Sequence, residues 1–338
     1  MKKALTILGV LILSLVLATQ AFAAGDVAND PQIILKIGIS TNDQDPRAIA
    51  AMEFLAAIEE KSGGSLKGQL YPSGQLGGDA ALIESLSLDA GMVDIIITDA
   101  SNFATYVPQM GISALPFQFD GFDTAWAFMD SEIVAKVEES LIEHNMRVLA
   151  HYCNGFRCVT TGSKVINSPE DMKNMLIRTP ENPVIMATMR AMGANPQPLA
   201  FSELYMALLQ GTYDAQENPI PVIYNNKLYE VQKNLSITNH IYSGMCFTIG
   251  ESVWQKMTEA QRAIVAEAAL ASQASNRNLN RTMTEDMLEK LEVECGMAIV
   301  QPDLEPFKAA TASVKDSLAA DYGAELMAQV DEWLSNNG

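Results

Sequence analysis

The chain has 338 residues, of which 48% are hydrophobic, and a formal net charge of −19 at pH 7. A surface this acidic repels nucleic acid, so we expect no nucleic-acid partner. The length exceeds what a single core comfortably supports, and we therefore expect two lobes. Histidine and cysteine follow no spacing typical of a zinc site or a redox motif. No metal and no cofactor are predicted.

The N-terminus has the organisation of a secretory signal. Lys2 and Lys3 precede an apolar run over residues 4–18, and residues 21–23 (Ala-Phe-Ala) offer the small side chains at which a signal peptidase cuts. The run is shorter than the roughly 20 residues that a membrane span needs. The sequence therefore predicts a signal peptide at residues 1–23 and a mature protein exported to the periplasm. A retained membrane helix is the alternative.

Hydrophobic periodicity and turn residues predict an alternation of strands and helices. Strands are expected at residues 33–39, 66–71, 92–98, 147–152, 157–161, 175–177, 235–242, 245–249 and 297–300. Helices are expected at residues 47–61, 80–88, 123–145, 182–192, 202–210, 220–229, 259–294 and 305–336. This alternation is typical of an α/β protein with a mostly parallel sheet. Residues 214–219 are interpreted as a polar run that returns to the same end of the sheet as residue 178.

Two segments should connect the lobes. Asn154-Gly155-Phe156 suits a crossing because glycine adopts backbone angles that other residues avoid. A capping box at Thr258 and Gln261 opens a helix long enough to lie across both lobes. The expected bounds are residues 24–153 plus 244–282 for lobe I and residues 154–243 plus 283–338 for lobe II.

The residue most indicative of function is Arg178. It lies at the end of a short apolar strand that Thr179 and Pro180 stop, because proline has no N–H to extend a ladder. Ligands of open α/β sheets bind outside the carboxyl ends of the strands, and the planar guanidinium suits a carboxylate. An ordinary ion pair is the alternative interpretation of this arginine.

Several separated segments resemble one known family. They are Ile177-Arg178-Thr179-Pro180, Gly193-Ala194-Asn195-Pro196, Phe201-Ser202-Glu203-Leu204-Tyr205, and Gly211 through Gln216-Glu217-Asn218-Pro219. In order and spacing they are similar to the periplasmic solute-binding subunit of TRAP transporters, the DctP-like family, and the likeness extends over nearly the whole mature chain. The resemblance implies an α/β, two-lobed periplasmic binding protein with Rossmann-like lobes, a hinge and a long lobe-spanning helix.

The resemblance also implies a set of ligand-binding residues. Arg178 would pair with the ligand's carboxylate, and Arg157 would be a second arginine near it, with a hinge-stabilising ion pair as its alternative role. The remaining candidates are Ser40, Asp79, Asp99, Asn102, Phe201, Asn218 and Glu181. Their alternatives are a turn residue for Ser40, a helix cap for Asp79 and a core position for Phe201. Glu181 stands where sialic-acid binders have asparagine, which argues against a large sugar acid and suits a hydroxyl or amino donor.

The implied function is transport. The resemblance implies delivery of a small organic acid to the two membrane permease subunits of a TRAP transporter. A hydroxylated monocarboxylate or sugar acid is the first candidate and a C4-dicarboxylate the second. No Gly-x-Ser-x-Gly elbow, phosphate loop or His-Glu-x-x-His motif occurs, so we expect no enzyme. We also expect a monomeric protein. A lyase or isomerase acting on a carboxylate and a ligand-sensing module are the alternatives.

Cys153 and Cys246 both fall where the chain should cross between the lobes. We therefore expect them to be near neighbours, and an exported protein permits a disulfide between them. Buried free thiols are the alternative.

Overall fold

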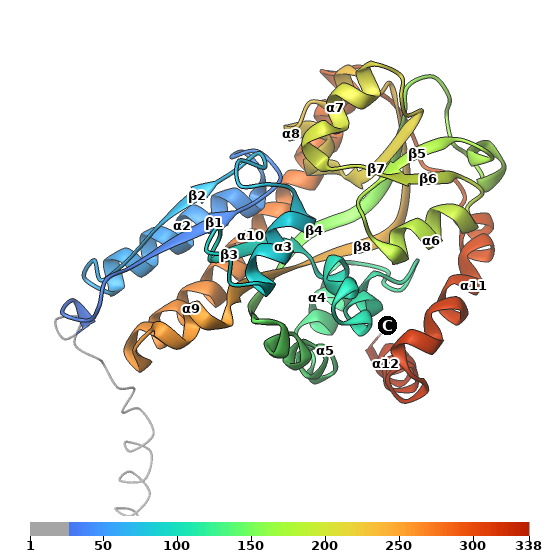
Figure 1. The fold of residues 1–338 in the computed structure, drawn as a ribbon. Helices are drawn as coiled ribbons and strands as arrows, with labels where there is room; N and C mark the ends of the chain where they lie inside the picture. Colours follow the sequence, from blue (N-terminus) through green and yellow to red (C-terminus); the bar gives the residue numbers. More distant parts are fainter. Residues whose placement is uncertain (1–26, 338) are drawn as a thin grey trace, which may run out of the picture.

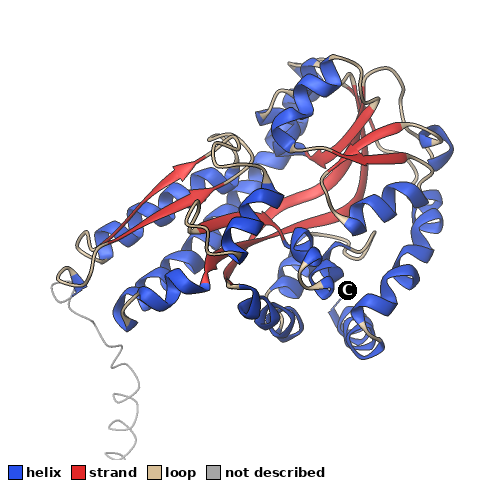
Figure 2. Cartoon of the chain, in the orientation of Figure 1, coloured by secondary structure: helices blue, strands red, loops and turns tan. Residues whose placement is uncertain are grey.

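The computed structural model describes residues 27–337, so the expected signal peptide at residues 1–23 lies outside the described residues. The chain forms one nine-stranded sheet with the order β2-β1-β3-β8-β4-β7-β5-β6, and β9 pairs with β8. Helices cover the sheet on both sides (Figures 1 and 2). The α/β alternation predicted from the sequence is therefore confirmed.

The bounds of the elements agree closely with most of the expected ranges. The strands are β1 Ile33–Gly38, β2 Leu66–Tyr71, β3 Ile95–Asp99, β4 Met146–Thr161, β5 Leu176–Thr179, β6 Asn195–Pro198, β7 Ala215–Pro219, β8 Asn234–Gly250 and β9 Ala298–Val300. The α-helices are α2 Pro46–Lys61, α3 Asp79–Ser87, α4 Phe122–Met129, α5 Glu132–Glu138, α6 Pro183–Ala191, α7 Phe201–Leu209, α8 Ile220–Asn225, α9 Glu251–Lys256, α10 Glu259–Val293, α11 Glu305–Tyr322 and α12 Ala324–Asn337. Short 3₁₀ helices are η1 Ala100–Thr105, η2 Pro108–Ala114, η3 Glu139–His144, η4 Pro169–Met172 and η5 Leu228–Glu230.

Two long antiparallel strands, β4 and β8, run through the middle of the sheet (Figure 1). The parallel strands β2, β1 and β3 attach to one end of β8, and the parallel strands β7, β5 and β6 attach to the opposite end of β4. The two halves run in opposite directions, so their carboxyl ends meet near the middle of β4 and β8. The ligand crevice expected at strand ends is therefore formed by both halves together.

Each of these long strands was expected as two separate strands, and that prediction is wrong. Pairing continues through the crossing, where Cys153 lies opposite Gly244 and Gly155 lies opposite Ser243. A register shift between Cys153 and Gly155 is absorbed by Gly155, which has a positive φ of 116°. A Cβ at this position would lie 3.1 Å from the Cβ of Pro219. The crossing thus needs glycine, as the sequence indicated, without interrupting the ladder.

The long helix α10 lies against β4 and begins with the predicted capping box of Thr258 and Gln261. The buried face of α10 is partly polar because its side chains form hydrogen bonds with the irregular backbone at the crossing. Asn276 accepts a hydrogen bond from the N–H of Cys153 (2.6 Å), and Asn280 donates to the carbonyls of Cys153 (3.1 Å) and Asn154 (2.9 Å). Side-chain amides on this helix therefore replace ladder bonds that the bulge removes.

Two further segments differ from the expected structure. The helix expected at residues 123–145 is broken into α4, α5 and η3, because Ser131 has extended backbone angles and its hydroxyl accepts a hydrogen bond from the N–H of Val134. Residues 214–219, expected only as a polar run that returns to the same end of the sheet as residue 178, are mostly the buried strand β7. Its polar side chains are satisfied inside the protein, as described below, which a hydrophobicity pattern does not reveal.

Cys153 and Cys246 are near neighbours, as expected, but they are not bonded to each other, so the alternative of buried free thiols holds. All four cysteines of the described chain are free, and three of them are buried. Cys153 lies opposite Gly244, while Cys246 lies opposite His151, so the two thiols occupy diagonal positions. Diagonal pairs in an antiparallel ladder have Cα atoms about 7–8 Å apart, beyond the reach of a disulfide.

The C-terminal helices contact elements assigned to both expected lobes. Residues of α11 and α12 join the same apolar core as residues of α4, β5 and α6. Trp333 of α12 packs against Phe128 of α4, with ring centroids 5.2 Å apart. Residues 283–338 were assigned to lobe II, and α4 to lobe I. The lobe bounds stay a prediction.

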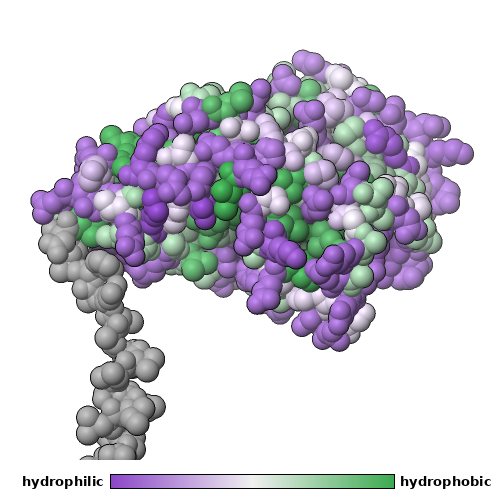
Figure 3. All heavy atoms as spheres, turned by 60° about the horizontal axis from the view of Figure 1, so that its bottom comes forward, coloured by the Kyte–Doolittle hydropathy of each residue, from purple (hydrophilic) through white to green (hydrophobic). Residues whose placement is uncertain are grey.

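The face shown in Figure 3 is largely hydrophilic, with hydrophobic residues gathered near its centre. The large hydrophobic side chains that are exposed, such as Met206 and Leu209 on α7 and Val293 at the end of α10, are scattered over several elements. Within residues 27–337, no helix is long and apolar enough to cross a membrane.

A charged cluster joins β4 to α4, α5 and α10. His151 contacts Glu138 through Nε2 (2.8 Å) and Asp130 through Nδ1 (3.2 Å), and Arg277 binds Asp130 with two nitrogens (2.6 and 2.7 Å). Burial alone would lower the pKa of His151, but the two carboxylates outweigh it and raise this pKa to about 9. The imidazole is therefore charged at neutral pH and stabilises the fold.

This cluster predicts a pH dependence of stability. Because the pKa of His151 is raised in the folded state, its contribution is complete below about pH 6.5 and is lost as the pH rises to about 9. We expect the free energy of unfolding to fall by up to about 3 kcal/mol over this range. Urea unfolding at several pH values measures it. The slope should vanish in His151→Gln and persist in His144→Gln, and an unchanged slope in His151→Gln would contradict the assignment.

Candidate ligand-binding site

Two adjoining cavities lie where the carboxyl ends of the strands meet. The inner chamber, of about 40 Å³, is lined by Ser40, Thr41, Arg47, Asp79, Thr98, Asp99, Asn102, Asn154, Arg157, Arg178, Pro180, Phe201 and Asn218. The outer chamber, of about 790 Å³, shares five of these residues, Asp79, Asn102, Arg178, Pro180 and Phe201. All the predicted site residues except Glu181 line the inner chamber, and Glu181 lines the outer one.

Arg178 lies on β5 and faces both chambers. Its Nε and Nη2 donate to the carbonyl of Leu199 (2.9 and 2.6 Å), and its guanidinium lies over the ring of Phe201, 5.8 Å from the centroid. The side chain forms no ion pair with any described residue, although Arg178 is only 3% exposed. Burial, with the nearby charge of Arg157, lowers its pKa to about 10. A buried and unpaired cation is the strongest indication of an anionic ligand here.

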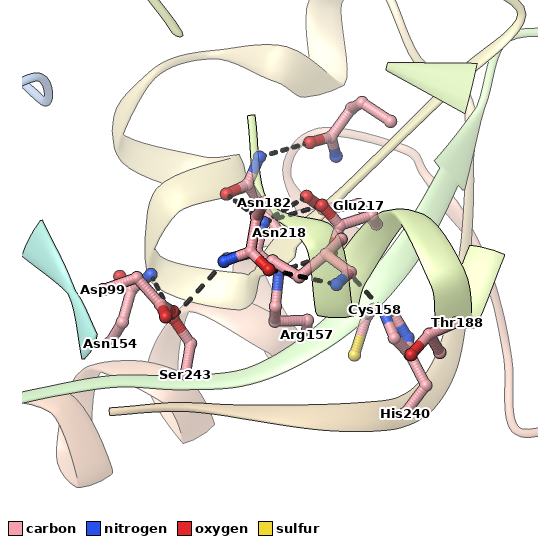
Figure 4. A network of polar contacts seen from close by, with 12 residues as sticks. Asp99, Asn154, Arg157, Cys158, Asn182, Thr188, Glu217, Asn218, His240 and Ser243 are labelled. Carbon is pink, nitrogen blue, oxygen red and sulfur yellow. Dashed lines mark hydrogen bonds and ion pairs between the residues drawn. The ribbon is translucent and has the colours of Figure 1, made fainter. Parts of the chain in front are cut away.

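Arg157, by contrast, already has a carboxylate partner (Figure 4). It contacts both carboxylate oxygens of Glu217, through Nε and through Nη2 (2.8 Å), and it also donates to Asn218 (3.2 Å). His240 lies 3.4 Å from the same carboxylate. Burial alone would raise the pKa of Glu217, but Arg157 and His240 outweigh it and lower this pKa. The geometry therefore matches the alternative interpretation of Arg157, a buried ion pair, while Nη1 stays close to Ser243 at 3.5 Å.

The wall formed by the first half of the sheet carries carboxylates. Asp79 begins α3 and is not its cap, since Gly78 has that position. One oxygen of Asp79 accepts from Ser40 (3.3 Å), and the other is buried without a partner among the described residues. Burial raises the pKa of Asp79. Asp99, at the end of β3, accepts hydrogen bonds from Ser101 and Ser243, so it is held in place.

The amide of Asn182 joins the two walls. Asn182 caps α6 by accepting from Val184 and Ile185, and it donates to Ser101 (2.6 Å) and Asn102 (3.1 Å) across the cleft. A second polar contact across the cleft lies beside the loop that follows β1. The inner chamber is therefore closed along this edge.

Another pair of amides closes the opposite side. Asn42 donates to the carbonyl of Asn225 (2.7 Å), and the Asn225 side chain donates to the carbonyl of Gln44 (3.2 Å). Above the chamber, a Cβ placed on Gly78 would lie 3.7 Å from the Cβ of Ala200. The two halves touch on several sides of the inner chamber, so the structure has the geometry of a closed form.

Sequence reasoning missed several residues in and around the chambers. Glu217 was quoted only as part of a motif, and its partner Arg157 lies 60 positions away. Arg47 offered a signal, since a cation in the first turn of a helix opposes the helix dipole and needs a reason. Asn154 was assigned to the crossing alone, although it also lines the inner chamber. Asn182 was predicted only as the start of a helix.

The charged side chains of the chambers can bind an anion. No cluster of His, Cys, Asp and Glu able to hold a metal ion occurs in the part of the chain that the structure describes. The imidazole of His240 lies fully buried between Thr238 (2.8 Å) and Glu217 and does not line either chamber.

Comparison with known proteins places the chain in a family of solute-binding proteins. The sequence model of the family described as bacterial extracellular solute-binding protein, family 7 (DctP), matches residues 37–321. The chain belongs to this family. It is also 32% identical over 305 residues to the 2,3-diketo-L-gulonate-binding periplasmic protein YiaO of Escherichia coli K12, which covers 88% of this chain and 91% of the relative.

Two solved structures of family members resemble the chain closely. The sugar acid binding protein DctPAm of Advenella mimigardefordensis, in complex with galactonate, superposes with a TM-score of 0.87 at 28% identity, over 91% of this chain and 99% of that chain. A TRAP periplasmic solute-binding protein of Polaromonas sp. JS666, bound to D-erythronate, gives a TM-score of 0.85 at 33% identity, over 88% and 98%. The two-lobed α/β fold predicted from the sequence is confirmed.

The DctP family supplies the biological role. Its members are periplasmic solute-binding proteins that take up a small organic acid and deliver it to the membrane permease, and this chain is such a subunit of a TRAP transporter. The family and the function predicted from the sequence are confirmed.

Proposed function

We propose that this subunit binds a small hydroxylated monocarboxylate or sugar acid across the inner and outer chambers, with its carboxylate on Arg178. The observation that carries the proposal is the pairing of charges. Arg157 is neutralised by Glu217 and Arg47 by Asp45, whereas Arg178 has no anionic partner in the described chain. One free guanidinium suits one carboxylate.

The other end of the ligand faces acceptors. Asp79 and Asp99 line the inner chamber and would repel a second carboxylate, whereas hydroxyl groups can donate to them. This favours a hydroxylated monocarboxylate over a C4-dicarboxylate. Asn102 and Asn218 add amide groups that both donate and accept, and Phe201 covers the guanidinium. Galactonate, D-erythronate and 2,3-diketo-L-gulonate, named as ligands of three of the relatives, support the same choice, although a further relative has bound succinate.

The remaining parts of the proposal concern the protein's cellular context. Residues 1–23 would be removed as a signal peptide on export to the periplasm, and the mature protein would act as a monomer that hands its ligand to the TRAP permease subunits. We propose no catalysis. Recovery of the ligand chemically unchanged after prolonged incubation tests this point, and a converted product would favour a lyase or isomerase.

A calorimetric titration panel tests the ligand class. Galactonate, D-erythronate and D-glycerate represent hydroxylated monocarboxylates, and succinate represents C4-dicarboxylates of similar length. We expect at least one hydroxylated monocarboxylate to bind more tightly than succinate. Tighter binding of succinate would overturn the proposal and would mean that a second cation of the inner chamber becomes available.

Closure of the two lobes is the proposed response to the ligand. If the lobes, residues 24–153 plus 244–282 and residues 154–243 plus 283–338, separate in the free protein, the contacts of Asn182 and Asn42 across the cleft should break. We expect small-angle X-ray scattering to give a smaller radius of gyration with the bound acid than without it. An unchanged radius would contradict closure by rigid lobes.

A further inference from the structure

Arg47 is a third arginine of the inner chamber, on the opposite half of the sheet from Arg178. It lies in the first turn of α2, directly after the loop that follows β1, and is only 4% exposed. A buried cation at a helix N-terminus is unfavourable on two counts, because it loses its hydration and meets the positive end of the helix dipole. Arg47 therefore needs polar partners, and its position in the chamber indicates a function.

The partners hold the guanidinium in one orientation. Nε donates to Asp45 (3.0 Å), the residue that caps α2, and Nη2 donates to the side-chain oxygen of Asn154 (2.6 Å). Asn154 is fixed in turn, since its amide nitrogen donates to Ser243 (3.1 Å). Nη1 of Arg47 donates to no atom within residues 27–337, although the side chain lines the inner chamber.

Arg47 and Arg178 act on the same chamber from its two walls. Both charges reach Asp79, where burial raises the pKa of the carboxyl and Arg47, followed by Arg178, opposes that rise. Because Asp45 already neutralises Arg47, a second carboxylate gains little there. A neutral oxygen accepting from Nη1 costs less to desolvate and still completes the guanidinium's hydrogen bonds.

We infer that Arg47 is a specificity-determining residue that donates from Nη1 to a hydroxyl oxygen of the ligand remote from its carboxylate. The inference rests on the proposed function and deepens it, because it states which part of a hydroxylated acid is recognised. An acid too short to reach Arg47 leaves that donor without a protein or ligand partner. The site should therefore prefer acids that carry hydroxyl groups beyond C2.

The same contact would connect the ligand to the crossing between the lobes. Asn154 follows Cys153, where the register of β4 shifts, and Ser243 lies opposite Gly155 on β8. A ligand oxygen on Arg47 thus joins a chain of hydrogen bonds that ends on the backbone segment about which the lobes would move. The chain continues from Ser243 to Asp99 at the end of β3.

The test compares ligands of graded length on wild-type protein and on Arg47→Met. Titration calorimetry is performed with glycolate, D-glycerate, D-erythronate and 4-deoxy-erythronate, which lacks only the terminal hydroxyl. Loss of one hydrogen bond to a charged group corresponds to about tenfold to a hundredfold in affinity. We expect Arg47→Met to lose this factor for the acid whose hydroxyl reaches Arg47 and less than about threefold for glycolate.

Arg47→Lys and the 4-deoxy ligand distinguish recognition of a hydroxyl group from a merely structural role of Arg47. A structural role would weaken all acids equally and lower the melting temperature, and that result would overturn the inference. If Arg47→Met does not fold, wild-type protein alone decides, because equal affinity for every acid along the series contradicts recognition at the far end. Failure of wild type to bind any hydroxy acid would overturn the proposed function as well, so the two failures are distinguishable.

Discussion

Replacing Arg178 with alanine should weaken binding of the acid by about 30-fold to several thousand-fold, since truncating one partner of a buried charge pair costs roughly 2–5 kcal/mol. The protein should stay folded. Arg178 has no carboxylate partner in the described chain, and its protein bonds go to one carbonyl, that of Leu199. Removing it therefore eliminates the cost of burying a cation. The space that it leaves joins the outer chamber, which is already large enough to hold water.

Calorimetric titration with the acid identified in the panel, together with melting temperatures, measures this. Arg178→Lys is the matched variant, because it keeps the charge and loses the planar fork, and it should also bind more weakly than wild type. Arg190, an exposed residue on the neighbouring helix α6, gives the control Arg190→Ala, which should bind normally. Near-normal affinity of a folded Arg178→Ala protein would place the carboxylate elsewhere, and Arg157 would be the next residue to test.

Replacing Glu217 with glutamine should cause the largest loss of stability, about 3–5 kcal/mol of unfolding free energy. The substitution keeps the shape of the side chain but leaves the guanidinium of Arg157 buried without a negative charge. Both partners are almost fully inaccessible, with side chains 4% and 0% exposed. Water cannot replace the lost carboxylate at this position, so the penalty for burying Arg157 is no longer offset.

Urea unfolding of Glu217→Gln measures the effect, with Glu267→Gln as the matched control. Glu267 forms an ion pair with Lys61, but both side chains are largely exposed, at 69% and 42%, and the loss should be below about 1 kcal/mol. The double variant Arg157→Met with Glu217→Leu should be more stable than Glu217→Gln, because it removes both charges together. Equal losses for Glu217→Gln and Glu267→Gln would show that the buried pair is not a stabilising feature.

The sequence predicted those elements whose signals are local. The amphipathic pattern of α2, the capping box of α10 and the apolar strands β1 and β2 are all present within a residue or two of the expected ranges. Strand β7 was missed because its buried side chains are polar, and their partners lie on β4, far away along the chain. Burial of such a strand depends on pairing between distant residues, which no local pattern encodes.

The site residues divide in the same way, into those with a local signal in the sequence and those that depend on distant contacts. Arg178 could be predicted because a strand end, a proline stop and a family motif coincide at one place. The pairing state of Arg157 could not, because only the three-dimensional contact with Glu217 shows that its charge is already neutralised. Arg47 was overlooked for a related reason, since an arginine early in a helix is ordinarily exposed, whereas this one is buried against Asn154.

The continuous pairing of β4 with β8 has a consequence for denaturation. Each strand contributes to both halves of the sheet, since β3 attaches to β8 at residues 245–249 and β7 attaches to β4 at residues 157–161. Neither half can lose its order without removing the strand on which the other half is built. Heating should therefore melt the protein in a single cooperative transition, with equal calorimetric and van't Hoff enthalpies. Two lobes that part to admit a ligand would still unfold as one thermodynamic unit.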